Sequence, residues 1–443
     1  MRFALCLPLL WVGLAFGCGD QRESGSSSGG KSSGGAPVAS GGATQGGATQ
    51  GLGGSVIAGE SSQGGDAQSG ADAGGAGGAP VTSSGGSVAM GGSGPDLSAE
   101  LYDPERVPHF ELELPKESVD ALTADPDTYV RGSLKYGSER VDDIGVRIKG
   151  EGSRRTLAQK AALKLKFDEF VDKQSFRGLR RLTLNNMVED PSFLAERLAY
   201  HVFRAAKLPA PRCNNALVTI NGQAYGVYAN VETEDKTFLR RWFTSDDGNL
   251  YEEGQKDFVP GAETAFDLET NETANDRSHL AELIDLLQSA TSENFLEHVG
   301  QALDMEHFLR FTAAEAAVNQ WDMYAYTVFY PNNFRLYDDP TKERFVFLPW
   351  GMDMSMKPFR DSGKPHIQVF TLARQGDARF GKITAGLLFQ RCVESAPCKA
   401  KLSQELASVA DVYEGLGLEA LAQRYHAQIA DHVQADPRKE YTA

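Results

Sequence analysis

The amino-acid sequence predicts an α+β protein of two lobes, the first rich in strands and the second rich in helices, with a disordered linker ahead of them. Residues 19–98 hold most of the glycine and no Phe, Tyr or Trp, so they lack the side chains that build a core. Between about Asp103 and Glu232 apolar and polar residues alternate, as in strands, and after residue 279 apolar residues recur at helical spacing.

The first 17 residues have the pattern of a secretory signal, with Arg2, an apolar run and small residues before Cys18. The run is too short to span a membrane as a helix. Ala15 to Cys18 resembles a bacterial lipobox, in which the cysteine is lipidated and becomes the new N-terminus; the alternative is an ordinary signal peptide. We therefore expect a protein of the cell envelope, lipid-anchored to a membrane on its periplasmic or outer side, or secreted.

Residues 18–98 are expected to form a flexible linker, because they cannot bury enough apolar surface to offset chain entropy. The repeat GGATQGGATQG lies within them. The composition beyond is that of a globular protein, so a folded domain is expected over 99–443. Its first lobe would cover about 99–235 and its second about 236–443.

Charge and cysteine content limit the function classes. The formal net charge of −16 argues against a nucleic-acid partner and against binding anionic lipid by charge, so membrane contact is expected only through the anchor. Beyond Cys6 and Cys18, the spacing of Cys392 and Cys398 allows a disulfide in an exported protein, and Cys213 is expected in the core. No cysteine–histidine spacing indicates zinc.

The first lobe shows alternating strand patterns and one helix. Lys164 and Lys166 fall on one face of a strand, opposite Leu163 and Leu165. Asp190-Pro191-Ser192 is a helix start signal. Strands are expected over 110–115, 143–152, 162–170 and 179–186, a helix over 192–208, and a hairpin over 216–232 with Asn221-Gly222 at its turn.

The second lobe shows helical patterns around one strand pair. Helices are expected over 279–290, 305–321 and 403–416, and paired strands over 332–339 and 344–350. A cleft between two such lobes is a natural ligand site.

Polar residues stand at the ends of several predicted elements. In the first lobe, VRIKGEGSRR places Gly150, Gly152, Ser153 and several cations where a strand ends, and such a loop suits phosphate. Lys164 and Lys166 follow, with a solvated strand face as the alternative.

In the second lobe Asp322, the pair Asn332-Asn333 and Asp353 stand at element ends. Singly they would be a cap, a hairpin entry and a helix N-cap. Together these oxygen ligands suit Mg²⁺ or Mn²⁺ bound with a phosphate substrate.

The ordered motifs VRIKGEGSRR with KLKF, DPSFLAERLAYHVFR, INGQAYGVYANVE, VNQWDMY, NNFRLYDD and FVFLPWGMD resemble the CotH kinase family of atypical protein kinases. The resemblance runs over about 105–440 and includes the closing DPRKEYT. It implies an atypical protein-kinase-like two-lobed fold. It also implies an exported kinase that uses ATP with Mg²⁺ (or Mn²⁺) to phosphorylate Ser or Thr of extracytoplasmic proteins.

The resemblance also implies roles for residues. Asp322 would be the catalytic aspartate that accepts the hydroxyl proton, Asp353 the metal-binding aspartate, and Asn333, with Asn332 as alternate, the second metal ligand. Lys166, with Lys164 or Arg147 as alternates, would contact the phosphates, and Glu196 would pair with that lysine. The residues expected at the nucleotide are Gly150, Gly152, Ser153, Lys166, Lys164, Arg147, Glu196 and, near the hinge, Glu232.

One position departs from the family pattern. Relatives often read PWDxDxxF or PWDxDG, whereas this chain has Gly351 in place of the first aspartate and Met354 after the second. The alternative function is therefore a catalytically inactive surface, coat-assembly or adhesion module of the same fold. A third reading is transfer of AMP rather than phosphate.

Overall fold

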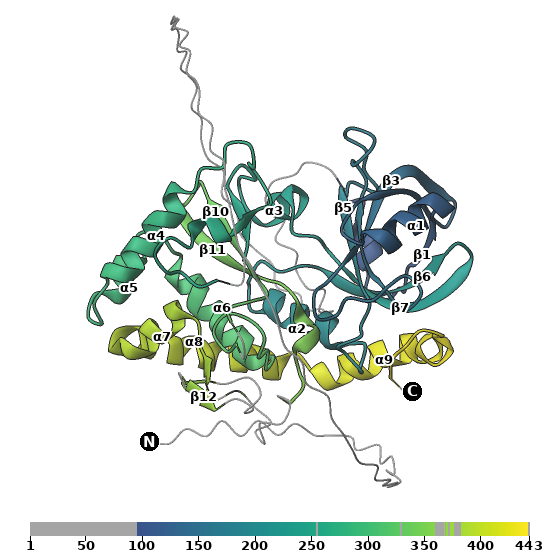
Figure 1. The fold of residues 1–443 in the computed structure, drawn as a ribbon. Coiled ribbons are helices and arrows are strands. Elements are labelled where there is room, and N and C mark those ends of the chain that lie inside the picture. Colours follow the sequence, from purple (N-terminus) through teal and green to yellow (C-terminus); the bar gives the residue numbers. More distant parts are fainter. Residues whose placement is uncertain are drawn as a thin grey trace, which may run out of the picture. The chain divides into compact units, whose positions relative to one another are not determined.

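The computed structural model describes residues 95–253, 256–327, 330–358, 367, 369–370, 373–375 and 382–441. All of them belong to one compact unit, Val81–Ala443 (Figure 1). The expected signal peptide, the anchor at Cys18 and almost all of the linker lie outside the described residues. In the part of the chain that is described, no helix is both long and apolar enough to cross a membrane.

The strands of the first half close into a barrel in the order β1-β2-β3-β4-β5-β7-β6 (Figure 1). Closure depends on β1, which runs parallel to β6 while its other neighbour β2 is antiparallel. The sequence predicted strands here but not their closure. The strands are β1 (His109–Glu113), β2 (Val130–Tyr136), β3 (Glu139–Lys149), β4 (Ala162–Lys166), β5 (Arg181–Asn185), β6 (Cys213–Ile220) and β7 (Gln223–Val231).

The barrel has an apolar interior and a basic outer face on β3 and β4. Ile148, Leu163 and Leu165 are buried in the interior, which confirms the predicted alternation. Because neighbouring residues of a strand point to opposite sides, Lys149 and Lys164 lie on the outer face.

Helix α2 (Ala195–Ala205) lies against the barrel and contributes to the core of the helical half. Its start signal is Asp190, as predicted, because Asp190 Oδ2 accepts the backbone N–H of Ala195 at 2.7 Å. The same core includes Val227 and Val231 of β7, so the barrel wall and the helices share one apolar interior.

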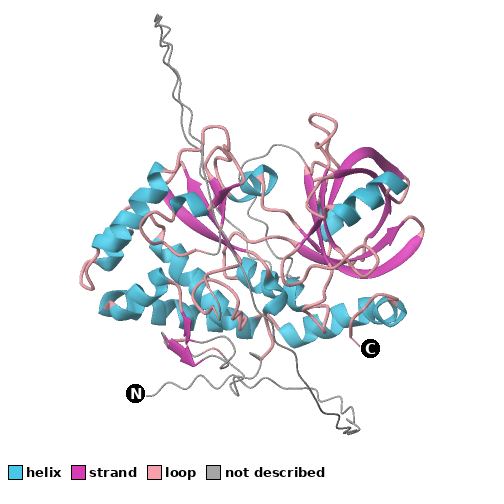
Figure 2. Ribbon diagram, viewed as in Figure 1, coloured by secondary structure: helices cyan, strands magenta, loops and turns pink. Residues whose placement is uncertain are grey.

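The second half holds a small sheet of order β11-β10-β8-β9 and most of the helices (Figure 2). The strands are β8 (Leu250–Glu252), β9 (Asp267–Leu268), β10 (Phe334–Asp339), β11 (Arg344–Pro349), β12 (Ala373–Gln375) and β13 (Lys382–Thr384). The helices outside the barrel half are α3 (Lys236–Trp242), α4 (Ser278–Ser289), α5 (Phe295–Val299), α6 (Met305–Ala317), α7 (Leu387–Glu394), α8 (Ala396–Gly415) and α9 (Leu418–Ala435). The remaining short elements are α1 (Lys116–Ala124), η1 (Ala99–Tyr102), η2 (Glu263–Ala265) and η3 (Met352–Met354).

A disulfide joins Cys392 to Cys398, as their spacing indicated, and Cys213 is a buried free thiol. The predicted helix and strand patterns all coincide with observed elements, with shifted ends. Alternation and helical spacing did not reveal β2, α1, α3 or α9.

Candidate functional site

Asp322 and Asn333 are in contact where β10 begins. Asn333 stands one residue before β10, at a left-handed backbone position with φ +52°. Its side-chain amide donates to Oδ2 of Asp322 at 2.9 Å and to the backbone oxygen of Asp322 at 2.6 Å. Asn332 also hydrogen-bonds the Asp322 side chain. The structure therefore brings together the acid and both amides that the sequence singled out.

Asp353 lies in the turn η3, directly after β11, and acts electrostatically on Asp322. Burial and then the charge of Asp353 raise the pKa of Asp322 to about 7, against the hydrogen bonds from Asn332 and Asn333. A carboxylate with such a pKa exchanges a proton readily near neutral pH. The two aspartates are thus within electrostatic reach of each other.

Glu196 and Lys149 form a second charged group close to Asp353. Lys149 Nζ donates to Asn185 Oδ1 at 2.5 Å, and the amide nitrogen of Asn185 donates to both carboxylate oxygens of Glu196, at 2.9 and 2.8 Å. Burial and then Asp353 raise the pKa of Glu196 to about 8, whereas Lys149 lowers it. Burial lowers the pKa of Lys149, and Glu196 and Asp353 oppose that shift. Asp353 therefore acts on both groups.

Hydrogen bonds tie together the segments that carry the two aspartates. The buried side chain of Gln320 donates to the carbonyl of Gly351 at 2.7 Å and accepts the N–H of Asp322 at 3.3 Å. The N–H of Trp350 donates to the carbonyl of Asn333 at 3.1 Å, and because this bond is made by the backbone, it does not depend on which side chains stand at either position. These bonds fix the turn after β11 against the loop before β10.

Gly351 occupies a position that suits glycine in this chain. Its backbone is left-handed, with φ +59°, and a Cβ atom there would collide with Oδ1 of Asn333. The space into which a side chain at position 351 would extend is therefore filled by the Asn333 amide. The departure from the family pattern at Gly351 thus goes together with the placement of the side-chain oxygen of Asn333 beside it.

The loop Gly150–Ser153 leaves the barrel directly after Lys149. Gly150 has φ +101°, and a Cβ there would lie 2.8 Å from Ser153 Oγ, whereas nothing lies within 4 Å of a Cβ at Gly152. Burial and then the carboxylates of Glu151 and Asp322 raise the pKa of Tyr330. Tyr330 is therefore within electrostatic reach of both Glu151 of the loop and Asp322.

The expected pair of Lys166 with Glu196 is wrong. Lys166 Nζ lies 2.7 Å from Glu169 Oε2, and it is Lys149 whose charge acts on Glu196. The register explains the difference, because Lys166 pairs with Gly145 at one end of the β3–β4 ladder while Lys149 stands at the other end. Strand alternation gave the correct face but not the position along the strand.

Lys164 is not on a solvated face. Its side chain is buried beside Glu252, Glu269 and Arg335, and burial lowers its pKa to about 8 while Glu252 opposes the shift. Arg335 Nε lies 3.0 Å from Glu234 and its Nη2 lies 3.1 Å from Glu252. Lys164 thus belongs to a buried ionic cluster that connects the barrel with the second sheet.

Arg147 and Glu232, two further residues expected at the nucleotide, make other contacts. Arg147 Nη1 lies 3.9 Å from Asp127 Oδ1. Glu232 accepts from Arg212 at 2.8 Å and pairs with Arg241. Burial raises the pKa of Glu232, but the two guanidinium groups outweigh it and the net shift is downward. Both residues thus have other partners in the structure, and their place at the nucleotide stays a prediction.

Sequence reasoning missed Lys149 and Asn185. Both are polar residues at strand ends, Lys149 in β3 and Asn185 in β5. The available signal was the alternation in VRIK, which places Lys149 on the same face as Arg147, directly before the glycines.

The residues around Asp322 fit a divalent cation with phosphate. Carboxylate and amide oxygens are hard ligands. Burial and then the charge of Asp353 raise the pKa of Asp322, and a cation held by Asp353 would offset the second of these causes. Among the described residues no group of three or more His, Cys, Asp or Glu could hold a metal by itself.

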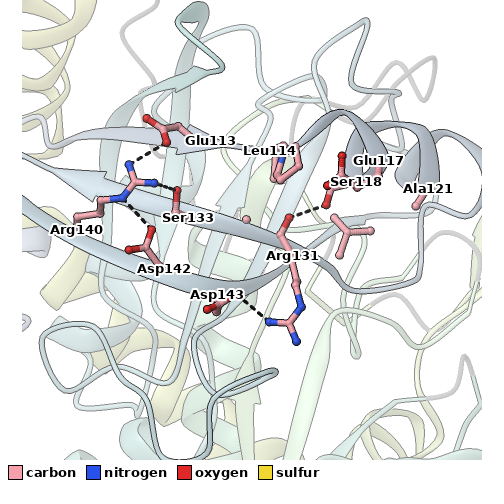
Figure 3. A pocket seen from close by; sticks show the side chains of 13 residues that line it. Glu113, Leu114, Glu117, Ser118, Ala121, Arg131, Ser133, Arg140, Asp142 and Asp143 are labelled. Atoms are coloured by element: carbon pink, nitrogen blue, oxygen red, sulfur yellow. Dashed lines mark hydrogen bonds and ion pairs between the residues drawn. The ribbon is translucent and has the colours of Figure 1, made fainter.

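A surface groove beside α1 has no predicted site residue in its lining (Figure 3). Its arginines already have acidic partners, since Arg140 pairs with Glu113 and Asp142, and Arg131 pairs with Asp143. We assign this groove no ligand.

Comparison with known proteins adds independent information. The family model described as CotH kinase protein matches residues 146–443. The inner spore coat protein H of Bacillus subtilis (strain 168) is 24% identical over 57% of this chain and 70% of that protein. An inner spore coat protein H-like protein of the same organism is 27% identical over 43% of this chain and 55% of that protein.

One solved structure, of the Helicobacter pylori proinflammatory kinase CtkA, matches 62% of this chain and 93% of that chain with 11% identity. The TM-score is 0.24, which is too low to decide how the halves are arranged. The match of the family model is of a different kind, because it covers more than half of the sequence and includes every residue of the two charged groups. The chain belongs to the CotH kinase protein family.

Proposed function

We propose that this protein is an exported, kinase-like phosphotransferase that moves the γ-phosphate of ATP to Ser or Thr hydroxyls of extracytoplasmic proteins. The observation that carries the proposal is the contact of Asp322 with Asn333, within electrostatic reach of Asp353, which in turn acts on Glu196 and Lys149. Family membership supports the same reaction class.

The chemistry assigns one role to each group. The acceptor hydroxyl oxygen forms the new bond to the γ-phosphorus, the bond from that phosphorus to the β–γ bridging oxygen breaks, and ADP leaves. Asp322 accepts the hydroxyl proton, for which a pKa of about 7 is well matched. Asp353 and Asn333 would hold Mg²⁺ or Mn²⁺, which supplies positive charge to the phosphates when bound. Lys149, oriented by Asn185 and Glu196, contributes a further positive charge there.

The kinase-like arrangement of two lobes is part of this proposal. Support comes from the order of the chain, a strand barrel first and a helix-rich half second, with the two charged groups drawn from both. We propose that the nucleotide lies between them, under the loop Gly150–Ser153.

Export and anchoring are proposed from the sequence. The apolar start and Cys18 support a lipid-anchored protein of the cell envelope, and a disulfide between Cys392 and Cys398 is typical of exported proteins. The linker would let the folded unit reach substrates away from the membrane.

A phosphotransfer assay tests the proposal. The full chain is incubated with γ-labelled ATP, Mg²⁺ or Mn²⁺ and a Ser/Thr-containing acceptor protein, beside Asp322→Asn and Asp353→Asn. We expect label only with the unaltered chain and with Asp285→Asn, a control that removes an exposed carboxylate on α4. Equal labelling by Asp322→Asn would contradict the assigned base, and the mass of the product separates phosphate from AMP transfer.

The second candidate function is an inactive surface module, favoured by the absence of an acid at position 351. A thermal-shift titration distinguishes the two. An active site predicts stabilisation by Mg-ATP that Asp353→Asn removes. No shift at millimolar nucleotide would favour the inactive module.

A further inference from the structure

The segment Asp436–Tyr441, which we call the strap, follows α9 and returns to the barrel. It contains most of the closing motif DPRKEYT, to which the proposed reaction gives no role. Its contacts fall on the segment 155–160, which directly continues the loop Gly150–Ser153, on strand β7 and on Val188.

A buried ion pair begins the strap. Lys160 Nζ lies 2.6 Å from Asp436 Oδ2, and the two side chains are 1% and 0% exposed. The same carboxylate oxygen accepts the N–H of Val227 at 3.0 Å. A Cβ atom at Gly226, where φ is +90°, would collide with this carboxyl group, so strand β7 receives Asp436 only because residue 226 has no side chain.

Arg438 holds the backbone of the same segment. Its Nη1 donates to the carbonyl oxygens of Ala158 at 2.5 Å and Gln159 at 2.9 Å, and its guanidinium lies 3.9 Å from the ring centre of Tyr225. The two hydrogen bonds go to main-chain atoms, so they are insensitive to which side chains the segment carries.

Two further contacts lie closer to the loop. Arg155 donates from Nε and Nη2 to the two carboxylate oxygens of Glu440, the second bond at 2.7 Å. Tyr441 donates its hydroxyl to the carbonyl of Val188. Between these points, the amide of Asn186 donates to the carbonyl of Ser153 at 2.9 Å and to that of Lys160 at 2.8 Å. The strap and Asn186 thus hold the loop's C-terminal side at several points.

We propose that the strap is a positioning element for the nucleotide, with Glu440 acting through Arg155 to set the place of the loop Gly150–Ser153. This inference rests on the proposed function in one respect, namely that the loop covers phosphate. A loop with two glycines does not fix its own conformation, because glycine is permissive in φ and ψ. Its position must come from its ends. Lys149 holds one end within β3, and the strap holds the other.

Glu440→Gln is the most suitable variant. The side chains of Arg155 and Glu440 are 23% and 35% exposed, so breaking their ion pair leaves no charge buried without a partner. Lys160 and Asp436 are less suitable for substitution, because removing either side chain leaves the other as an unpaired buried charge and threatens folding. The matched control is Glu405→Gln, which breaks a bond of 3.0 Å to Arg310 in a pair that is 28% and 19% exposed, on α6 and α8.

Two measurements are made on the full chain. Hydrogen exchange of the peptide 150–160 needs no nucleotide and reports local opening. We expect Glu440→Gln to raise its exchange rate, Glu405→Gln to leave it unchanged, and the charge-swapped double variant Arg155→Glu/Glu440→Arg to restore protection. The KM for Mg-ATP should rise about tenfold in Glu440→Gln while kcat stays within about twofold, because a displaced loop weakens nucleotide binding.

The outcomes separate the two proposals. If exchange at 150–160 does not change in Glu440→Gln, the strap does not order the loop and the inference is overturned, whatever the activity. If exchange rises but KM does not, the loop does not position nucleotide and the inference is again overturned. If the unaltered chain transfers no phosphate, the proposed function fails, and the exchange data alone decide whether the strap orders the loop.

Discussion

Lys149 and Lys160 stand at the two ends of one connected segment, and their surroundings differ. Lys160 is paired directly with one carboxylate, Asp436, and lies 5.2 Å from the ring centres of Phe193 and Tyr228. Lys149 reaches its carboxylate Glu196 through the amide of Asn185. One lysine therefore has a completed ion pair, whereas the other has an indirect one.

The charge balance around the two lysines differs in the same way. Lys160 and Asp436 neutralise each other. Lys149 faces both Glu196 and Asp353, and Asp353 also acts on Asp322, so three carboxyl groups are linked electrostatically around this lysine. A group of excess carboxylates is costly unless a cation joins it. The comparison teaches that a completed buried pair serves stability, while an incomplete one marks the place where a ligand supplies the missing charge.

Replacing Lys149 tests the functional side of this comparison and should have the largest effect. Lys149→Met should lower phosphotransfer by about 100-fold or more, because it removes a positive charge aimed at the phosphates. The variant also removes a positive charge from beside Glu196 and Asp353, so its melting temperature is measured alongside and activity is compared below the unfolding transition of both proteins. Lys166→Met, which loses only the contact with Glu169, should keep its activity. If Lys166→Met lost more phosphotransfer activity than Lys149→Met, the sequence-based assignment of Lys166 to the phosphates would be favoured instead.

Replacing Lys160 tests the structural side. Lys160→Met leaves the buried carboxylate of Asp436 without its cation and should cost about 3–5 kcal/mol of unfolding free energy. Urea unfolding at fixed pH measures this. The double variant Lys160→Met/Asp436→Leu should recover part of the loss, because no unpaired charge remains. A single variant as stable as the double one would show that the pair does not have this role.

Gly351 allows a smaller, local test. Gly351→Ala should cost about 1–2 kcal/mol for the left-handed backbone and should also lower kcat, because the new Cβ displaces the side chain of Asn333. Gly417→Ala is the matched control, with φ +60° and nothing within 4 Å of the added atom. Both variants should lose similar stability, and only the first should lose activity. Equal kcat values for Gly351→Ala and Gly417→Ala would contradict the proposal that Asn333 is a metal ligand.

A further expected effect is a dependence of stability on pH. The pKa of Glu196 is raised to about 8 in the folded state, so the stabilisation from its bound proton is present below its unfolded pKa and is lost as pH rises through about 8. Without metal or nucleotide, the stability of the unaltered chain should fall over this window by at most about 1.4 kcal/mol per pH unit. Glu196→Gln should flatten the slope in urea unfolding. If the dependence of unfolding free energy on pH did not change in Glu196→Gln, groups other than Glu196 would be responsible for it.

The sequence predicted most of the local structure, and the reasons for its failures are specific. Alternation placed Leu163 and Leu165 inside and the lysines outside, because the period of a strand is set by backbone geometry. Barrel closure depends on a parallel contact between β1 and β6, which are about 100 residues apart in the sequence, and local periodicity carries no information on such contacts. The contacts by which the strap returns to the barrel after α9 could not be predicted for the same reason, because they join residues far apart in the sequence.

In the candidate site too, local patterns indicated some residues, whereas others depend on long-range contacts. Asp322, Asn333 and Asp353 were found because each is a polar residue at the end of an apolar element. The choice among Lys149, Lys164 and Lys166 depended on the position of each along β3 and β4, and therefore on strand register and on the distant Glu196. No pattern within the strands distinguishes these lysines.

Because residue 226 is glycine, the strap binds to the barrel as a peptide ligand binds to a recess. The missing side chain leaves β7 a recess for the carboxyl group of Asp436, with an N–H from Val227 and the ammonium of Lys160 as donors. A chain that ends before Asp436 would leave the buried ammonium of Lys160 without its carboxylate and should be less stable for that reason. A synthetic peptide that carries Asp-Pro-Arg-Lys-Glu-Tyr should therefore bind to a shortened chain and complement it in trans.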